Sequence, residues 1–200
     1  MSGLTPEEAE WASTLDSGSR VAVIGCASGR QVWGLARLDH NPIGLDLKPA
    51  MLRLAKTGKG QGRPAWICGD ATQTPIFTAG VDAIMLGLYV GSLFTQETKR
   101  DSLYREIFRI LRPGGSLYMT FQTEQLLWQR ARNRAGSLIS DLTGFPRNKH
   151  VRPAYSLDPS GRIFLFDYFY YTDIVMRRTL QNNGFVQVKI KGRTVACIKR

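Results

Sequence analysis

The short stretch Gly25-Cys26-Ala27-Ser28-Gly29 has the composition of a ligand-binding loop. It follows the apolar run Val21–Ile24 and precedes a helical pattern that starts at Arg30. Gly25 and Gly29 lack a Cβ atom, so the backbone can turn sharply there and approach a bound molecule closely. Ala27 adds only a methyl group. The loop is therefore a candidate cradle for a ligand.

Asp46 and Asp70 could contact the same ligand. Asp46 comes 21 residues after Gly25, at the end of the apolar run Ile43–Leu45. A carboxylate in this place can accept hydrogen bonds from both ribose hydroxyls of an adenosine. Asp70 follows the next apolar run, Ala65–Cys68. Each aspartate taken singly is also compatible with a turn or a helix cap, because aspartate favours both.

The elements that must position these residues alternate regularly along the chain. Apolar, β-branched runs bounded by turn residues are typical of strands buried in a parallel sheet. We expect strands at Val21–Ile24, Ile43–Asp46, Ala65–Cys68, Val81–Leu86, Ser116–Phe121, Phe185–Ile190 and Thr194–Ile198. We expect helices at Pro6–Leu15, Arg30–Leu38, Pro49–Lys56, Glu97–Leu111 and, after an N-cap at Thr172, up to Asn182. The series predicts a doubly wound α/β fold with a seven-stranded, mostly parallel sheet and a C-terminal antiparallel hairpin.

This pattern resembles the class I S-adenosylmethionine-dependent methyltransferases, over roughly residues 18 to 121 and 171 to 199. The first loop of that family normally reads acidic-x-Gly-x-Gly-x-Gly, and the corresponding positions here are Val23, Gly25, Ala27 and Gly29. The phrases Gly69-Asp70-Ala71 and Leu111-Arg112-Pro113-Gly114-Gly115 also match and stand in the right order. A nicotinamide dinucleotide site would instead require glycine at positions 25, 27 and 30, where this chain has Ala27 and Arg30.

The resemblance implies a Rossmann-like methyltransferase fold with S-adenosylmethionine as cofactor. It places the methionine part of the cofactor at the first loop, where an acidic residue at position 23 usually helps to hold the amino-acid end. It also implies that Asp46 binds the ribose and that Asp70 accepts from the adenine amino group. The residues expected to bind the cofactor are Gly25, Cys26, Ala27, Gly29, Asp46, Leu47, Asp70, Ala71 and Leu86.

The acceptor is expected beside the end of the fourth strand, where Tyr89 lies. Tyr89 is all that remains of the Asn/Asp-Pro-Pro-Tyr/Phe motif of enzymes that methylate exocyclic base amines, so that chemistry is disfavoured. Arg130 and His150 are further candidates for substrate binding, although an exposed loop histidine would look the same. Methyl transfer is an in-line displacement that requires alignment more than any fixed catalytic residue, and no catalytic residue is assigned.

Residues 122–170 form a basic insertion or lid within what we expect to be a single domain, 1–200. Glu124–Leu142 has a helical pattern, and Thr143–Arg162 is expected to be a loop because it is rich in Pro, Gly and basic residues. The formal net charge is +11, and residues 122–200 hold 14 Lys and Arg against 5 Asp and Glu. This excess suits an anionic partner or a merely solvated basic face.

The sequence also predicts the cellular location of the protein and the state of its cysteines. The acidic N-terminal segment and the absence of an 18-residue apolar run predict a cytoplasmic protein that is not bound to membranes. Cys26, Cys68 and Cys197 have no metal-ligand spacing and are expected to be buried free thiols. His40 is expected on an ordinary surface turn, and we predict no metal site.

The functional hypothesis is a methyltransferase transferring a methyl group to a small organic, possibly anionic, acceptor. Two alternatives remain open. The same fold could methylate RNA through its basic second part, or the chain could be a non-catalytic methyltransferase-like binding module, because Val23 and Ala27 depart from the usual loop.

Overall fold

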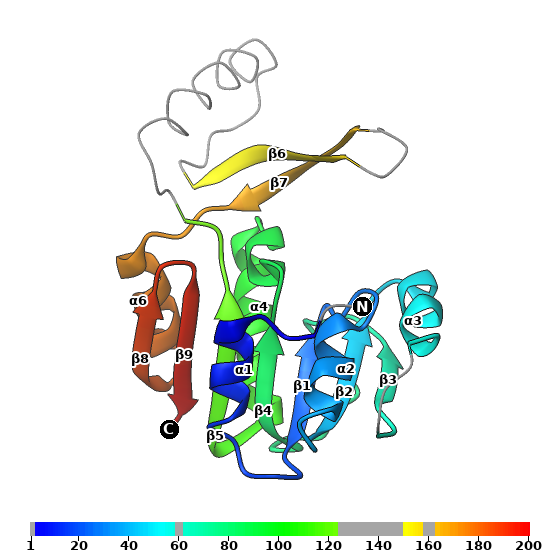
Figure 1. Ribbon diagram of the computed structural model, residues 1–200. Helices are drawn as coiled ribbons and strands as arrows, with labels where there is room; N and C mark the ends of the chain where they lie inside the picture. The colour runs from blue at the N-terminus through cyan, green and yellow to red at the C-terminus, as the bar shows by residue number, and fades with distance from the viewer. Residues whose placement is uncertain (1–2, 59–61, 124–149, 158–162) are drawn as a thin grey trace.

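The computed structural model describes residues 3–58, 62–123, 150–157 and 163–200. Its main sheet has seven strands in the order β3-β2-β1-β4-β5-β9-β8 (Figure 1). The first five strands of this order are parallel, while β9 pairs antiparallel with β5 and with β8. The strands are β1 Arg20–Ile24, β2 Asn41–Asp46, β3 Ala65–Cys68, β4 Val81–Leu86, β5 Leu111–Thr120, β8 Phe185–Lys191 and β9 Thr194–Lys199. The predicted fold class is confirmed.

Alternation along β1 shows how the core is divided. Val21 and Val23 face one side of the sheet, and Ala22 and Ile24 face the other, all four with no exposed surface. Helices α1 and α2 cover the first side, and α4 and α6 cover the second. A strand covered on both faces is expected to read as a continuous apolar run. The helices are α1 Pro6–Ala12, α2 Arg30–Ala36, α3 Pro49–Lys56, the short 3-10 helix η1 Val90–Leu93, α4 Glu97–Ile110 and α6 Asp173–Asn182.

Several predicted boundaries are wrong by a few residues. Helix α1 ends at Ala12 and α2 at Ala36, earlier than Leu15 and Leu38. Strand β5 starts at Leu111 and not at Ser116, because Leu111 already pairs with Val81. The pairing register shifts after this pair, where the sequence indicated only a turn. Such ends depend on pairing partners that are remote in sequence, so local pattern fixes them poorly.

A second, two-stranded sheet lies beyond the carboxyl ends of the parallel strands (Figure 1). It consists of β6, Val151–Leu157, paired antiparallel with β7, Ile163–Phe169. The prediction of a loop over Thr143–Arg162 is therefore wrong for Val151–Leu157. Pro153 weakened the strand signal, but a hairpin of two edge strands tolerates proline. The predicted helix Glu124–Leu142 lies outside the described residues.

The hairpin is joined to the domain at a tightly packed base. Thr123 and Tyr171 form a parallel bridge, and the Tyr171 N–H donates to the Gln122 carbonyl over 2.8 Å. The Tyr171 side chain is fully buried, and the Tyr104 hydroxyl of α4 donates to its hydroxyl oxygen over 3.1 Å. Burial raises the pKa of the Tyr171 hydroxyl to about 12. The backbone at Thr123, before the hairpin, and the backbone at Tyr171, after it, are thus held side by side.

Two expectations about single residues fail for reasons of position. Cys68 is exposed because β3 is the edge strand of the sheet, whereas Cys26 and Cys197 are buried as expected. His40 is buried beneath α1, with Nε2 3.2 Å from the Ala12 carbonyl oxygen, and does not lie on a surface turn. Within the ranges given above, no helix combines the length and the apolar composition needed to cross a bilayer.

Candidate functional site

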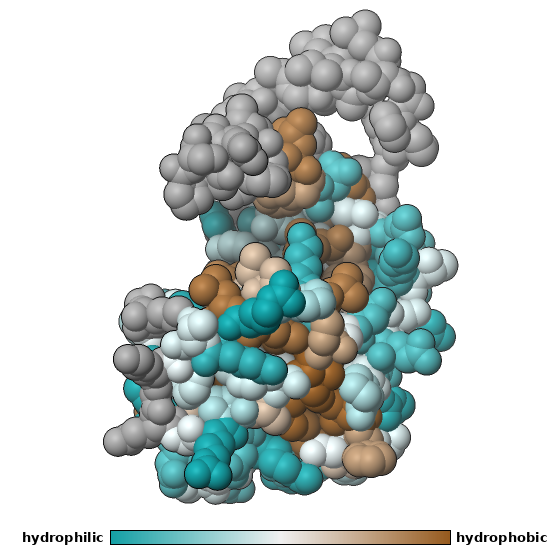
Figure 2. All heavy atoms as spheres, turned by 90° about the vertical axis from the view of Figure 1, so that its right-hand side faces the viewer, coloured by the Kyte–Doolittle hydropathy of each residue, from teal (hydrophilic) through white to brown (hydrophobic). Residues whose placement is uncertain are grey.

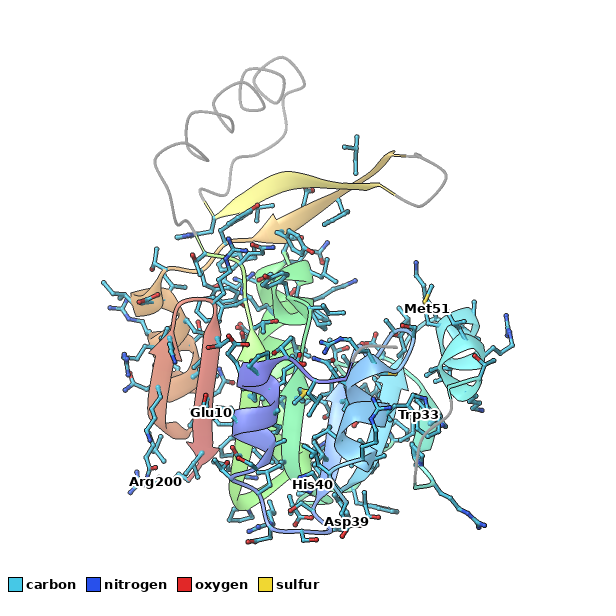
Figure 3. The ribbon with its side chains drawn as sticks, viewed as in Figure 1. Glu10, Trp33, Asp39, His40, Met51 and Arg200 are labelled. Carbon is cyan, nitrogen blue, oxygen red and sulfur yellow. The ribbon has the colours of Figure 1, made fainter. Side chains whose placement is uncertain are left out.

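The predicted ligand residues meet at one edge of the sheet. The loop 25–29 follows β1, Asp46 ends β2, Asp70 follows β3 and Tyr89 follows β4. Parallel strands end at the same edge, so residues that are far apart in sequence become neighbours there. Met51 on α3 lies towards this edge, whereas Asp39 and His40 lie at the opposite end (Figure 3).

The loop after β1 is fixed by backbone hydrogen bonds. The Gly25 and Cys26 N–H groups both donate to the Leu45 carbonyl, at 2.8 and 3.0 Å, and Gly29 N–H donates to the Cys26 carbonyl over 2.8 Å. Gly25 has a φ of +70°, and a Cβ there would lie 2.5 Å from Val90 Cγ2. Glycine is therefore required by conformation and by the approach of η1 together.

The same loop contains a strained alanine and a second packed glycine. Ala27 has a φ of +45°, a region that L-residues adopt at a cost. Gly29 has a φ of +80°, and a Cβ there would lie 2.8 Å from the Trp66 ring. Trp66 also packs against Trp33, with ring centroids 6.0 Å apart. The loop is thus packed against the Trp66 ring at Gly29 and against Val90 at Gly25.

Asp46 connects the loop to β2. Its Oδ2 accepts from the Ala27 N–H over 2.8 Å, and its Oδ1 accepts from the Lys48 N–H over 2.9 Å. Each oxygen keeps a second lone pair, so the carboxylate can still accept from two hydroxyl groups. Leu47, next to it, has 66% of its surface exposed. A half-buried acceptor beside an exposed apolar side chain suits a nucleoside.

Apolar side chains are also exposed on the β3 side of the molecule (Figure 2). Figure 2 views this side and shows apolar residues gathered between hydrophilic ones. The large apolar side chains that are exposed on α3 and after β3 are Met51, Leu54 and Phe77.

Asp70 is exposed and is oriented by Thr72. Its Oδ1 accepts from both the N–H and the hydroxyl of Thr72, each over 2.8 Å. These hydrogen bonds, the backbone one foremost, hold the pKa of the Asp70 carboxyl below its ordinary value. The carboxylate is therefore a charged acceptor at neutral pH. Ala71 is half-buried beside it.

The chain leaves β4 through two residues in an unusual conformation. Leu88 and Tyr89 have φ values of +51° and +62°. Consecutive non-glycine residues in this region are strained, and such strain clusters at functional sites. The Tyr89 N–H donates to Thr120 Oγ1 over 2.9 Å, and Arg193 Nη1 donates to the Tyr89 hydroxyl over 3.3 Å. Leu86 is fully buried, so only its main chain can reach a ligand.

Aromatic side chains continue from Tyr89 along the hairpin. The rings of Tyr89 and Tyr168 are 6.4 Å apart, and Tyr168 lies 5.0 Å from Phe166 and 6.4 Å from Tyr170, all edge to face. We call these four residues the aromatic wall. Burial, and then the nearby Tyr170 and Tyr89, raise the pKa of the Tyr168 hydroxyl. The wall runs from the end of β4 along β7.

Known proteins resemble this chain in sequence and in fold. Residues 22–119 match the model of a family described as a methyltransferase domain. A SAM-dependent methyltransferase structure from Methanosarcina mazei aligns with a TM-score of 0.76 and 21% identity, covering 98% of each chain. Residues 22–119 thus match a methyltransferase domain, and the chain has the fold of that structure. That neighbour is a SAM-dependent methyltransferase by name, and S-adenosylmethionine is the cofactor that the sequence predicts for this chain.

Two curated relatives are similar in sequence. The biotin biosynthesis bifunctional protein BioHC of Cellvibrio japonicus (strain Ueda107) is 33% identical over 103 residues, which cover 51% of this chain and 19% of BioHC. The tRNA (carboxymethyluridine(34)-5-O)-methyltransferase ALKBH8 of Mus musculus is 29% identical over 137 residues, or 68% of this chain and 20% of ALKBH8. The chain thus spans about a fifth of the length of these relatives.

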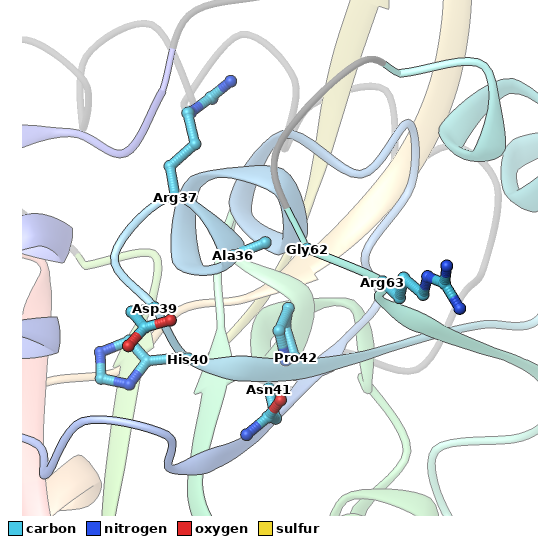
Figure 4. Close-up of a pocket in the computed structure, with 8 residues that line it drawn as sticks. All are labelled: Ala36, Arg37, Asp39, His40, Asn41, Pro42, Gly62 and Arg63. Carbon is cyan, nitrogen blue, oxygen red and sulfur yellow. The ribbon is translucent and has the colours of Figure 1, made fainter.

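The residues at the edge fit S-adenosylmethionine. Asp46 offers acceptors for a ribose, and Asp70 offers a carboxylate oxygen beyond the one held by Thr72. The methyltransferase domain also has a small cavity of about 160 Å³ near His40, shown in Figure 4. It lies at the amino end of β2, opposite Asp46, and is lined by Ala36, Arg37, Asp39, Asn41, Pro42, Gly62 and Arg63. Its position separates it from the cofactor residues.

The other acceptor candidates of the methyltransferase domain lie differently. Arg130 is outside the described residues. The His150 ring packs against Phe169 with centroids 5.4 Å apart, and the Arg100 guanidinium lies 3.8 Å from the centroid of the same Phe169 ring. His150 is therefore built into the base of the hairpin, and its role in substrate binding stays a prediction.

Sequence reasoning missed a buried polar cluster beneath the site. Glu8 and Gln31 are 2% and 3% exposed, and Arg30 forms an ion pair with Glu8 over 2.6 Å. The capping-box pattern Thr5-x-x-Glu8 explains a carboxylate at the start of α1. No local pattern indicates that this carboxylate also reaches α2, because that contact exists only once the methyltransferase domain is folded.

Proposed function

We propose that this chain transfers a methyl group from S-adenosylmethionine to a small, planar organic acceptor. The observation that carries the proposal is the aromatic wall, which begins at Tyr89 and continues along β7. Aromatic side chains bind planar molecules through their faces and edges. Leu88 and Leu93, with 56% and 48% of their surfaces exposed, add apolar contact area near the same strand end.

The cofactor supplies an electrophilic methyl group on a sulfonium. The protein's part is to align the acceptor with this group and to exclude water. In the proposal, the loop 25–29, Asp46, Leu47, Asp70 and Ala71 bind the cofactor, together with the main chain of Leu86. Tyr89 and Tyr168 then hold the acceptor ring in line. Arg193, which donates to the Tyr89 hydroxyl, favours an acceptor with a negative charge.

Residues 122–170 belong to the same proposal as a lid on a single domain. The hairpin β6–β7 lies beyond the edge to which the cofactor residues contribute (Figure 1). Contacts between Tyr168 and Tyr89 connect it to the end of β4. A lid in this place would shield the reacting groups from water and would set the acceptor's size.

Calorimetric titration with S-adenosylmethionine, S-adenosylhomocysteine and NADPH tests the cofactor half of the proposal. We expect binding of the first two alone. A methyl-transfer assay on hydroxylated aromatic carboxylates, with the matching cyclohexane carboxylates as controls, tests the acceptor half. Turnover of aromatic compounds that is lost in Tyr168→Leu would support it, while equal turnover of saturated compounds would contradict it.

RNA is a second candidate acceptor. Lys189, Lys191 and Arg193 are exposed along β8 and the turn before β9, and Arg193 donates to Tyr89 of the aromatic wall. A tRNA methyltransferase is among the similar proteins, and basic surface with aromatic side chains suits single-stranded nucleic acid. Filter binding of an RNA oligonucleotide at two salt concentrations tests this candidate. Tight, salt-sensitive binding would favour RNA, and no binding at low salt would eliminate it.

A further inference from the structure

The side chain of Gln31 is buried but only half satisfied. It is 3% exposed, and its Nε2 donates to Glu8 Oε1 over 2.6 Å. Its Oε1 accepts no hydrogen bond from any described residue, and the oxygen is not fully sealed from solvent. An amide oxygen in so buried a side chain is stabilised when a donor reaches it. Gln31 therefore presents an acceptor that a ligand could use.

The orientation of the Gln31 amide follows from Glu8. The Glu8 carboxylate receives four hydrogen bonds, from Thr5 N–H, from Arg30 Nη1 and Nη2, and from Gln31 Nε2. Burial alone would raise the pKa of Glu8, but the hydrogen bonds led by Arg30 outweigh it and hold the pKa below its ordinary value. An ionised carboxylate only accepts, so the NH₂ group of Gln31 must face Glu8. The oxygen is thereby turned away from Glu8.

The Gln31 amide lies beside the end of β4. A Cβ on Gly87 would lie 2.6 Å from Gln31 Oε1 and closer still to Nε2. Gly87 does not have a positive φ, so backbone conformation does not require glycine there. Glycine is required there because the Gln31 side-chain amide approaches so closely. Gly87 follows Leu86 directly, so Gln31 lies against the end of β4, where the Leu86 main chain contacts the cofactor in the proposed function. Gln31 also comes two residues after the loop 25–29, at which the methionine part of the cofactor is expected.

Position 23 offers no alternative acceptor. Val23 is fully buried and packs with Trp11, Val32 and other apolar residues. The carboxylate of Glu8 is already filled by its four donors. Gln31 Oε1 is therefore a side-chain acceptor at this strand end to which no described residue donates. The amino-acid end of S-adenosylmethionine carries an ammonium group, which has three N–H donors and needs such acceptors.

We propose that Gln31 Oε1 accepts a hydrogen bond from the ammonium group of the cofactor, and that Glu8 acts as the positioning residue that fixes the Gln31 amide. The inference rests on the proposed function, because it requires the cofactor at this strand end. Helix α1 thus contributes to cofactor binding without touching the cofactor, through Glu8.

Binding of S-adenosylhomocysteine and of its analogue lacking the α-amino group tests this proposal by calorimetry. The wild-type protein should bind S-adenosylhomocysteine about tenfold or more tightly than the desamino analogue, the range for a hydrogen bond to a charged group. Gln31→Met should lose most of this preference and leave the affinity for the desamino analogue unchanged. Glu8→Gln should lose part of it, because the amide is then free to turn.

The outcomes separate the possible failures. Equal wild-type affinity for the two ligands would overturn the proposal whether or not the variants fold. Gln31→Met binding both ligands as wild type, or weakened equally for both, would also overturn it, since a purely structural role moves both affinities together. No wild-type binding of either ligand would sink the proposed function as well. Gln181→Met, at an exposed glutamine on α6, is the matched control and should leave both affinities unchanged.

Discussion

The Ala27 N–H donates to Asp46 Oδ2 over 2.8 Å, which joins the loop after β1 directly to the end of β2. In the proposed function Asp46 therefore has two tasks, since it holds the loop in place and would offer acceptors to a ribose. We expect Asp46→Asn to weaken S-adenosylhomocysteine binding about tenfold or more, because a charged acceptor is replaced by a neutral one. Calorimetry against Asp39→Asn, at the other end of β2, measures this. An unchanged dissociation constant would remove Asp46 from the site.

Gly25 is expected to tolerate no side chain. Gly25→Ala combines the cost of a left-handed conformation with a contact of 2.5 Å to Val90. Gly192 also has a positive φ, but nothing lies within 4 Å of a Cβ there. Gly25→Ala and Gly192→Ala should each lower the free energy of unfolding by about 1 kcal/mol because of the left-handed conformation. Gly25→Ala should lower it by about 1–3 kcal/mol more because its Cβ overpacks against Val90. Urea unfolding of both compares them, and equal losses would show that Val90 moves aside freely.

Gly25→Val is the stronger form of the same change. Its branched side chain would displace Val90 or the loop, so we expect cofactor binding to be abolished. Calorimetry with S-adenosylhomocysteine measures this, and retained affinity would refute the assigned path of the cofactor over the loop.

Ala27 is expected to be a site where glycine stabilises. An L-residue in the left-handed region costs about 1–2 kcal/mol, while added freedom of the unfolded chain with glycine offsets about 0.4–1 kcal/mol. Ala27→Gly should therefore raise the free energy of unfolding slightly, by about 0.5 kcal/mol. Ala36→Gly, in α2, should lower it by about 0.5–1 kcal/mol. Chemical denaturation measures the free energy of unfolding of both variants. Destabilisation of both would mean that the Ala27 methyl group makes stabilising contacts.

The ion pair of Glu8 and Arg30 predicts part of the acid response. The pKa of Glu8 is lower in the folded protein than its ordinary value of 4.5. Its contribution to stability is present above that value and is lost as pH falls through the folded pKa. Glu8→Gln should destabilise the protein at neutral pH and flatten the fall in melting temperature below about pH 4.5. Glu10→Gln, on the exposed side of α1, should keep the wild-type slope, and identical slopes in all three proteins would argue against this assignment.

Local sequence pattern predicted the central sheet well because its strands are buried on both faces. Val21–Ile24 is apolar throughout, and no other element suits such a short run between turn residues. The positions of Asp46 and Asp70 followed from the strand ends. Cys68 was misplaced because an apolar strand at the edge of a sheet has the same pattern as a central one, and strand order depends on the whole chain.

The hairpin and the buried polar cluster could not be predicted as easily. Alternation of aromatic residues from Phe164 to Tyr170 is a period-two signal that favours β7, but Pro153 obscured its partner. Gln31 looked like an ordinary helical residue. Its contact with Glu8 joins residues 23 positions apart, and its contact with Gly87 depends on the crossover between β1 and β4.

Because Thr123 and Tyr171 form a bridge, the segment between them can be exchanged as one unit. The chain departs from the sheet and returns to it at adjacent places, so a replacement segment of any length needs to span only the gap between two neighbouring backbones. The cofactor half of the domain, from β1 to β4, would not be disturbed by such an exchange. Acceptor choice could then change between relatives by substitution of one interchangeable piece, while the chemistry of the methyl donor is inherited intact.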